Sequence, residues 1–88
     1  MTYDVDLSRQ AKRFLQRNSP KIADPISVFI FGPLVENPHR VGKQLGLGLV
    51  GLYSARVGNF RILYRIGEEI EIVWVETIAH RADAYRGG

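Results

Sequence analysis

Residues 53–65 of this chain alternate apolar and polar side chains on both sides of a Gly58-Asn59 pair. The alternation predicts two antiparallel strands joined by a two-residue turn, which places Arg56 opposite Arg61. The core face of this hairpin is predicted to consist of Tyr53, Ala55, Val57, Phe60, Ile62, Tyr64 and Ile66. On the other face, two guanidinium groups directly opposite each other destabilise the sheet, and a bound anion would relieve that repulsion.

The sequence before the hairpin predicts a strand followed by two helices. Alternation with aspartates indicates a half-buried strand at Tyr3, Val5 and Leu7. Helical spacing then predicts one helix that is capped by Ser8 and ends at Asn18. A second helix begins at Pro20 or at Pro25, since each follows a good capping residue, and ends near Asn37-Pro38.

A last strand is predicted from Ile70 to Ile78, and its face depends on the turn before it. A three-residue turn at 67–69 places Arg65 opposite Glu71, whereas a two-residue turn exchanges the two faces. We favour the three-residue turn because it buries the large apolar side chains of the strand. Those side chains are Ile70, Ile72, Trp74 and Ile78.

These elements predict an α+β fold in a single domain that covers residues 1–88. The expected order is an N-terminal strand, a helical hairpin, an antiparallel three-stranded meander and a short helical tail at the C-terminus. The helices should pack on one face of a four-stranded sheet. A chain of 88 residues has room for one modest core.

Composition narrows the class of protein. The sequence contains no cysteine, so it offers neither a disulfide framework nor a thiolate metal site. It lacks both an apolar run of about 20 residues and the pattern of a signal peptide, so we expect a cytoplasmic protein that does not enter a membrane. A G-x-G-x-x-G at Gly46, Gly48 and Gly51 precedes a strand instead of a helix, which favours a flexible connection over a dinucleotide site. We therefore expect no metal and no other cofactor.

Charge is divided along the chain. Residues 39–66 contain five basic and no acidic side chains, whereas residues 67–79 contain four glutamates and neither lysine nor arginine. The basic residues are Arg40, Lys43, Arg56, Arg61 and Arg65. This basic zone suits a phosphate backbone, although a solvated polar face has the same composition.

The C-terminal tail adds further candidate site residues. If residues 80–86 turn helically, Arg81 and Tyr85 lie on one face beside the end of the last strand. The sheet and the tail could then present Arg56, Arg61, Arg81 and Tyr85 around one point. His80, at the start of the tail, is a candidate for proton transfer because an imidazole has an ordinary pKa of about 6.5.

Four motifs together resemble the RelE/ParE superfamily of bacterial toxins, most closely its RelE-like branch. They are Gly42-Lys43-x-Leu45, Gly51-Leu52-Tyr53-Ser54-Ala55-Arg56, Gly58-x-Phe60-Arg61-Ile62-Leu63-Tyr64 and His80-Arg81-Ala82-Asp83-x-Tyr85. The RelE branch implies a ribosome-dependent endoribonuclease that cuts messenger RNA, and the ParE branch implies a DNA gyrase inhibitor without nuclease activity. A third possibility is a non-toxic module that only binds its partner. In every case the resemblance implies a cognate, RelB-like antitoxin.

The resemblance also implies roles for individual residues. Arg61 matches the arginine that stabilises the transition state, Arg81 matches the arginine after the last strand, and Tyr85 matches the tyrosine that stacks on or orients the nucleotide. Two lysines of the well-studied ribonucleases fall here at Ser54 and Arg56. Serine supplies no charge, and arginine holds its proton too tightly to act as a base.

The implied chemistry is attack of a ribose 2′-OH on the adjacent phosphate, without a metal. The predicted catalytic residues are therefore Arg61, Arg81, Tyr85 and His80, and the predicted RNA-binding residues are Arg56, Ser54, Lys43 and Arg65. The uncharged Gly46-Leu47-Gly48 segment is expected to weaken the affinity for RNA. Basic residues on the first helix, at positions 9, 13 and 17, would either pair with an acidic segment of the antitoxin or be solvated.

Overall fold

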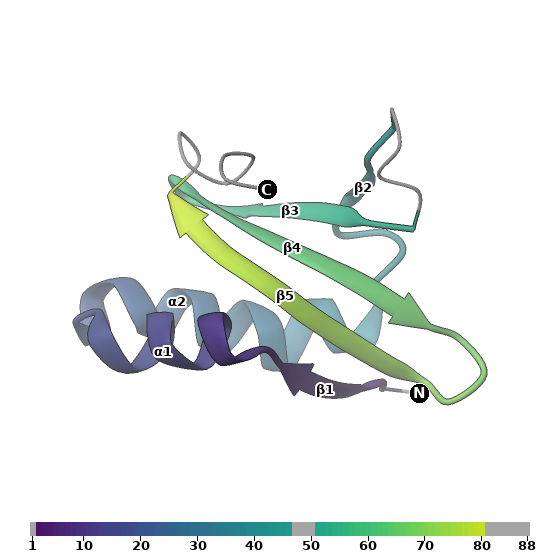
Figure 1. The fold of residues 1–88 in the computed structure, drawn as a ribbon, viewed down its shortest axis with the longest axis horizontal. Helices are drawn as coiled ribbons and strands as arrows, with labels where there is room; N and C mark the ends of the chain where they lie inside the picture. Colours follow the sequence, from purple (N-terminus) through teal and green to yellow (C-terminus); the bar gives the residue numbers. More distant parts are fainter. Residues whose placement is uncertain (1, 47–50, 81–88) are drawn as a thin grey trace.

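The computed structural model describes residues 2–46 and 51–80, which form a mixed five-stranded sheet with helices on one face (Figure 1). The strand order is β1-β5-β4-β3-β2, with β1 parallel to β5 and the other neighbours antiparallel. The strands are β1 (Asp4–Leu7), β2 (Lys43–Gln44), β3 (Tyr53–Val57), β4 (Phe60–Gly67) and β5 (Ile72–His80), and the helices are α1 (Arg9–Arg17), α2 (Pro20–Phe29) and the π-helix η1 (Ile30–Leu34). The predicted fold class is confirmed, and the short β2 adds a fifth strand to the four predicted. The predicted helical tail lies outside the described residues.

The first helix has the predicted caps and is fixed to the sheet by polar side chains. Ser8 Oγ accepts a hydrogen bond from the Ala11 N–H and donates one to the carbonyl oxygen of Glu76. The side-chain amide of Gln10 donates to the Ile78 carbonyl oxygen at 2.7 Å and accepts from the Ile78 N–H at 2.8 Å. Since β1 pairs with β5 only as far as Val75, Gln10 takes the place of a neighbouring strand at Ile78.

The second helix begins at Pro20, which decides between the two possible starts. Pro25 lies inside α2 on its exposed side, and the helix continues into η1, which contains Pro33. A proline cannot donate to the carbonyl four residues earlier, and a π-helical turn is one of the ways in which a helix accommodates such an interruption. The last helical residue is Glu36, close to the predicted end.

The predicted turn before the last strand is wrong. Four residues, 68–71, connect β4 to β5, so Arg65 lies opposite Trp74 and not opposite Glu71. A register shift beside Leu63 and Tyr64 leaves Glu76 as an extra residue on β5, which is a β-bulge. The bulge breaks strict alternation, and the buried residues of β5 are Val73, Val75 and Ile78. Ile70, which was predicted to be in the core, is 61% exposed.

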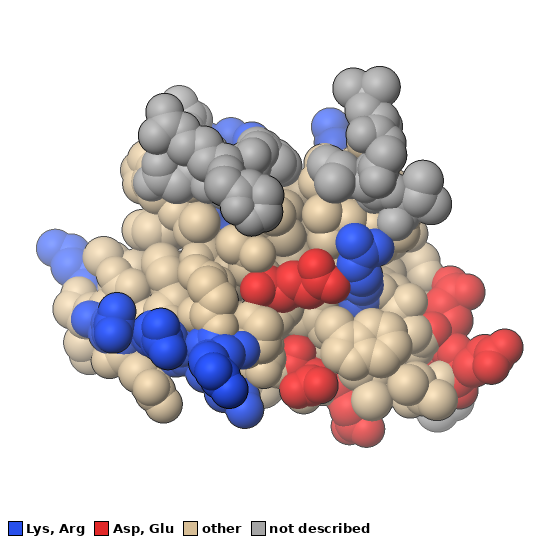
Figure 2. All heavy atoms as spheres, viewed as in Figure 1, with Lys and Arg blue, Asp and Glu red and all other residues tan. Residues whose placement is uncertain are grey.

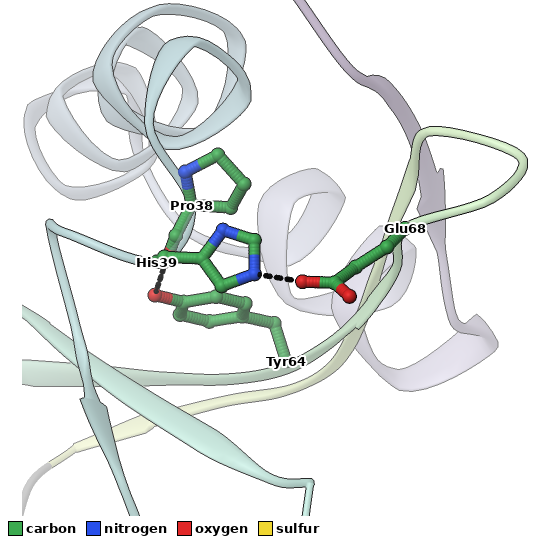
Figure 3. A network of polar contacts seen from close by, with 4 residues as sticks. All are labelled: Pro38, His39, Tyr64 and Glu68. Carbon is green, nitrogen blue, oxygen red and sulfur yellow. Dashed lines mark hydrogen bonds and ion pairs between the residues drawn. The ribbon is translucent and has the colours of Figure 1, made fainter.

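The core includes one polar group that the chain satisfies internally. Tyr64 is fully buried, and its hydroxyl donates a 2.6 Å hydrogen bond to the carbonyl oxygen of Pro38 (Figure 3). Burial raises the pKa of Tyr64 above its ordinary value, and nearby Tyr53 raises it further, so the phenol remains a neutral donor. Gly42 passes so close that a Cβ there would collide with the Tyr64 hydroxyl.

A second polar contact lies beside the first and joins two turns. His39 Nε2 and Glu68 Oε1 are 2.6 Å apart, which connects the turn at residues 38–40 to the β4–β5 turn (Figure 3). The imidazole also meets the rings of Tyr3 and Tyr53 edge to face, at centroid distances of 6.5 and 6.0 Å. This cluster holds the N-terminus and both turns together at one end of the sheet.

Basic and acidic side chains gather over different elements on the face seen in Figure 2. Figure 2 shows a row of basic side chains over α1, and acidic side chains over β1 and the β4–β5 turn. The acidic residues on these two elements are Asp4, Asp6, Glu68, Glu69 and Glu71. None of the helices formed by residues 2–46 and 51–80 combines the length and the apolar character needed to cross a bilayer.

Candidate functional site

The candidate site is an arginine pair on the face of the sheet opposite the helices. Arg56 of β3 and Arg61 of β4 are cross-strand partners, as the alternation predicted. They alternate with Ala55 and Ile62, whose side chains are buried in the core, so both guanidinium groups project from the helix-free face. Two like charges at opposite positions disfavour pairing, and their common partner would be an anion.

The two arginines differ in their surroundings. Arg56 is exposed, and its Nε donates a 3.0 Å hydrogen bond to the carbonyl oxygen of Gly58 in the β3–β4 turn. Arg61 is partly buried, and its Nε is shielded from solvent. A guanidinium that is partly removed from water interacts more strongly with a phosphate, and its planar fork can contact two phosphate oxygens at once. Arg61 is therefore the better placed of the two to stabilise a developing charge.

The cross-strand residues next to the arginine pair on the same face are mostly shielded from solvent. Ser54, which occupies a lysine position of the resembling family, lies opposite Leu63, and these side chains are 6% and 7% exposed. Lys43 of β2 lies opposite Ser54 on the other side and is exposed. The structure thus places Lys43 near the arginine pair, while Ser54 presents little surface to a ligand.

Arg65 is held by a residue that the sequence analysis missed. Its Nε lies 2.8 Å from Glu76 Oε2, and each side chain is 42% exposed. Glu76 is the extra residue of the β-bulge, so its carboxylate joins the same face as the arginines. The sequence does carry a signal for Glu76, since it is a charged residue within an otherwise mostly apolar strand. This carboxylate lowers the positive charge at the Arg65 end of the basic zone.

The predicted proton-transfer residue lies on the other side of the sheet. His80 is the cross-strand partner of Phe60, and their ring centroids are 5.6 Å apart. Phe60 in turn meets Phe14 of α1, so the helix side of the sheet carries both rings. Because directly opposite residues share a face, His80 and Arg61 project from opposite faces. Two further predicted catalytic residues, Arg81 and Tyr85, lie outside the described residues.

The donor set of this face is cationic, and it suits an anion rather than a metal ion. In the part of the chain that the structure describes, no three histidine, aspartate or glutamate side chains gather as metal ligands would. The arginine pair, with Lys43 beside it, instead offers several N–H donors and fixed positive charge. Such groups can bind a phosphodiester and stabilise charge on its oxygens.

Comparisons with known protein families and sequences all identify bacterial toxins as the relatives of this chain. A family model described as "ParE toxin of type II toxin-antitoxin system, parDE" matches residues 5–85. Two toxins of Mycobacterium tuberculosis (strain ATCC 25618 / H37Rv) are similar over nearly the whole chain. Toxin RelE is 45% identical, with 96% of this chain and 87% of that protein covered. Toxin RelG is 43% identical, with 98% and 99% covered.

Solved structures extend the similarity to the fold. The toxin–antitoxin complex RelBE2 of Mycobacterium tuberculosis contains a chain that matches with a TM-score of 0.85 and 40% identity, covering 92% of this chain and all of that one. The isolated Escherichia coli RelE toxin matches with a TM-score of 0.73 at 17% identity, and the match covers 97% of this chain and 87% of that one. At this identity the match shows a shared fold. This chain therefore belongs to the ParE toxin family and is a RelE-like toxin of a type II toxin–antitoxin system.

Proposed function

We propose that this toxin is a ribosome-dependent endoribonuclease that cleaves messenger RNA and thereby inhibits translation. The observation that carries the proposal is the pairing of Arg56 with Arg61 on the helix-free face of the sheet. Identities of 43–45% to toxins named RelE and RelG support the same branch of the family. Two cations at one point provide what a phosphodiester needs in order to accumulate negative charge.

The proposed reaction is an internal transfer at one phosphate. The ribose 2′-oxygen forms a bond to phosphorus, the bond from phosphorus to the 5′-oxygen of the next nucleotide breaks, and a cyclic phosphate and a free 5′-OH remain. Arg61 would contact the phosphoryl oxygens, and Arg56 would position the backbone beside it. In addition, Arg81 stays a predicted second donor. The reaction needs one group to accept the 2′-OH proton and another to protonate the leaving oxygen.

Of the candidates for proton transfer, His80 faces the helices and not the arginine pair. His80 would act only on RNA that reaches the end of β5, where the two faces of the sheet meet. Tyr85 remains a predicted candidate if the arginines lower its pKa. General acid and base groups contribute about 10² to 10⁴ in rate, and orientation of the RNA by the ribosome adds to any such group.

The predicted RNA-binding residues are expected to contribute unequally to the affinity for RNA. Lys43 is exposed and extends the positive charge across β2. Arg65 shares its charge with Glu76, and Ser54 is nearly buried, so both would contribute less. RNA binding should therefore depend mainly on the arginine pair and Lys43.

We also propose a RelB-like antitoxin as the partner. The similar Mycobacterium tuberculosis chain was solved in a complex described as toxin–antitoxin, and the Escherichia coli and Pyrococcus horikoshii RelE toxins were each also solved with RelB. Messenger RNA on ribosomes is the proposed target, so the proposed place of action is the cytoplasm.

The deciding experiment is primer extension on cellular transcripts after brief expression of this chain. Cuts inside translated frames are expected for the wild type, and none for Arg61→Ala. Lys21→Ala, which removes an exposed lysine on the helix side, is the matched control and should cut normally. Intact transcripts with the wild-type toxin would overturn the nuclease proposal.

The family model's ParE description favours one alternative, inhibition of DNA gyrase. That function predicts DNA breaks and loss of supercoiling, while transcripts remain intact and growth stops. A module that only binds its partner predicts neither cuts nor growth arrest. The same expression culture, probed for transcript ends and plasmid supercoiling, separates all three.

A further inference from the structure

Trp74 of β5 shares the helix-free face of the sheet with the arginine pair, and the proposed cleavage chemistry does not use it. It lies directly opposite Arg65 of β4, whereas its neighbours Val73 and Val75 are buried in the core. Side chains alternate along a strand, and cross-strand partners share a face. The indole of Trp74 therefore projects from the same side of the sheet as the two guanidinium groups.

The backbone of the neighbouring strand lies under part of this indole. The six-membered ring of Trp74 lies over Gly67, where a Cβ would come within 2.6 Å of the Cη2 atom and 2.8 Å of the Cζ3 atom. Glycine at this position lets the ring approach the strand closely. Ile70 lies beside the same point, since its Cγ1 would be 3.4 Å from that Cβ. The ring is thus held in place at the β4–β5 end of the sheet.

Covering a strand glycine explains an aromatic ring here, but it does not use the polar edge of a tryptophan. An indole N–H normally finds a hydrogen-bond partner when it is buried. Within residues 2–46 and 51–80, the N–H of Trp74 donates to no protein group, and it is not among the unpaired side-chain atoms that are shielded from solvent. This edge of the ring therefore faces the solvent, where a ligand can reach it.

The surface between Trp74 and the arginine pair is built of short or shielded side chains. Arg65, the partner of Trp74, lies four residues from Arg61 along β4, which is roughly 13 Å in an extended strand. The side chains between them on this face are those of Ser54, Leu63, Thr77 and Ala79. A single RNA strand whose phosphate lies at the arginine pair can therefore reach the indole within a few nucleotides.

The charges around Trp74 favour an uncharged ring over a phosphate. The guanidinium of Arg65 is already paired with Glu76, at 2.8 Å. The β4–β5 turn adds the exposed side chains of Glu68, Glu69 and Glu71. These carboxylates repel a phosphate, whereas a base carries no net charge and offers a π-face on which an aromatic side chain can stack. A cationic side chain could also rest on an indole, but it would be repelled by the arginine pair on the same face.

We propose that Trp74 is a stacking platform for one base of the RNA substrate, a few nucleotides from the cleaved phosphate. This inference rests on the proposed function and adds the course of the strand, which runs from the arginine pair toward the β4–β5 turn. Phosphate contacts then dominate at one end of the face and base stacking at the other. Because stacking accepts every base, the platform contributes affinity and position and not sequence preference.

The test uses the fluorescence of Trp74, which is the only tryptophan of the chain. The probe is a single-stranded RNA of about eight nucleotides, a length typical of such sites, with 2′-O-methyl groups that prevent cleavage. Stacking of a base on the indole should quench the fluorescence to saturation. An oligomer of the same length without bases keeps the phosphates, and it should not quench.

Variants separate stacking from packing, with affinity for the end-labelled RNA measured by fluorescence anisotropy. Trp74→Leu should bind roughly tenfold more weakly, because the π-face is lost. Trp74→Phe should keep most of the affinity, since it retains a ring. Val28→Ala, which shortens an apolar side chain that is 70% exposed on α2, is the control and should bind normally. Circular dichroism checks that each variant is folded.

Each other outcome overturns the inference. RNA that binds without quenching, or that does not bind, would show that no base lies on the indole. Wild-type affinity in Trp74→Leu would mean that the ring only covers Gly67. Equal quenching by the oligomer without bases would place a phosphate there, and quenching by a triarginine peptide but not by RNA would indicate a basic protein segment. None of these measurements involves cleavage, so their result is independent of primer extension with Arg61→Ala.

Discussion

The two ends of this molecule use charge in different ways. At the end formed by β1 and the β4–β5 turn, glutamates make contacts inside the protein, as Glu68 does with His39 and Glu76 with Arg65 nearby. At the other end, Arg9, Arg13 and Arg17 of α1 are exposed. Arg56 is exposed as well and lies opposite another arginine. The glutamates at the first end are therefore engaged in contacts within the fold, whereas the exposed arginines at the other end are proposed to meet a partner. Neutralising a charge should change stability slightly at the first end and activity strongly at the second.

The sharpest test of this difference is Arg61→Ala. Loss of one positioned donor to a developing charge costs roughly 10² to 10³ in the rate of an enzyme. Cleavage of messenger RNA on purified ribosomes should fall by that factor, measured as the single-turnover rate. The free energy of unfolding should change much less than the cleavage rate, since loss of the guanidinium also removes its repulsion with Arg56. If the variant unfolds more easily and also cuts normally, Arg61 acts in stability and not in cleavage.

Tyr64→Phe should show the opposite behaviour. It removes the hydrogen bond to the Pro38 carbonyl oxygen inside the core, and a buried group left without its partner costs about 1–3 kcal/mol. Urea unfolding measures this loss, while the activity of the folded fraction should be unchanged. Tyr53→Phe, which alters a partly buried ring stacked on Tyr64, is the control and should cost less.

The stability difference between the wild type and Tyr64→Phe should also depend on pH. The folded protein raises the pKa of Tyr64, and an unfolded tyrosine ionises at about pH 10. Because the unfolded state then releases a proton that the folded state keeps, the stabilisation is complete below pH 10 and decreases as the pH rises above it. The stability gap between wild type and Tyr64→Phe should therefore narrow above about pH 10 in urea titrations. A gap that widens there would contradict the neutral buried phenol.

Glu76→Gln tests the acidic end at an ion pair close to the site. Both side chains are 42% exposed, so loss of the pair should cost less than about 1 kcal/mol in unfolding free energy. Loss of the carboxylate raises the net positive charge beside Arg65 on the face proposed to bind RNA, so the affinity for RNA should rise slightly. Weaker RNA binding in this variant would show that Glu76 acts in the site and not only in the fold.

Glu68→Gln is the smallest expected change. The His39–Glu68 pair is on the surface, with side chains 45% and 71% exposed, and salt screens such pairs. Thermal unfolding should shift only slightly, and the shift should vanish at high salt. Cleavage should be normal. If Glu68→Gln lowered cleavage as much as Arg61→Ala does, charges at both ends of the molecule would act in cleavage, and the difference between the two ends would be wrong.

The sequence predicted the fold well where the physical signal is local. The Gly58-Asn59 turn and strict alternation determine the pairing of Arg56 with Arg61, and Ser8 and Asn18 mark the ends of α1. The start of α2 stayed open because two serine- or aspartate-proline pairs satisfy the same rule. The two residues of β2 carry too short a pattern to be recognised as a strand.

The errors arise where one residue changes the register. The bulge at Glu76 lets Val75 and Ile78 share a face, which no alternating pattern predicts. The position of His80 was within reach of the sequence, since alternation from Ile78 already places it on the core side. It was predicted to be catalytic because of the ordinary pKa of an imidazole and its place beside Arg81 in the chain. Arg81 and Tyr85 remain predictions.

The contact between Gln10 and Ile78 also bears on how the chain behaves at high concentration. Past the end of β1, strand β5 has an outer edge whose backbone groups could pair with the strand of another molecule. The side-chain amide of Gln10 occupies both groups of Ile78, in the middle of that edge. We expect this glutamine to protect the sheet against self-association, so a Gln10→Ala chain should aggregate at concentrations where the wild type remains in solution.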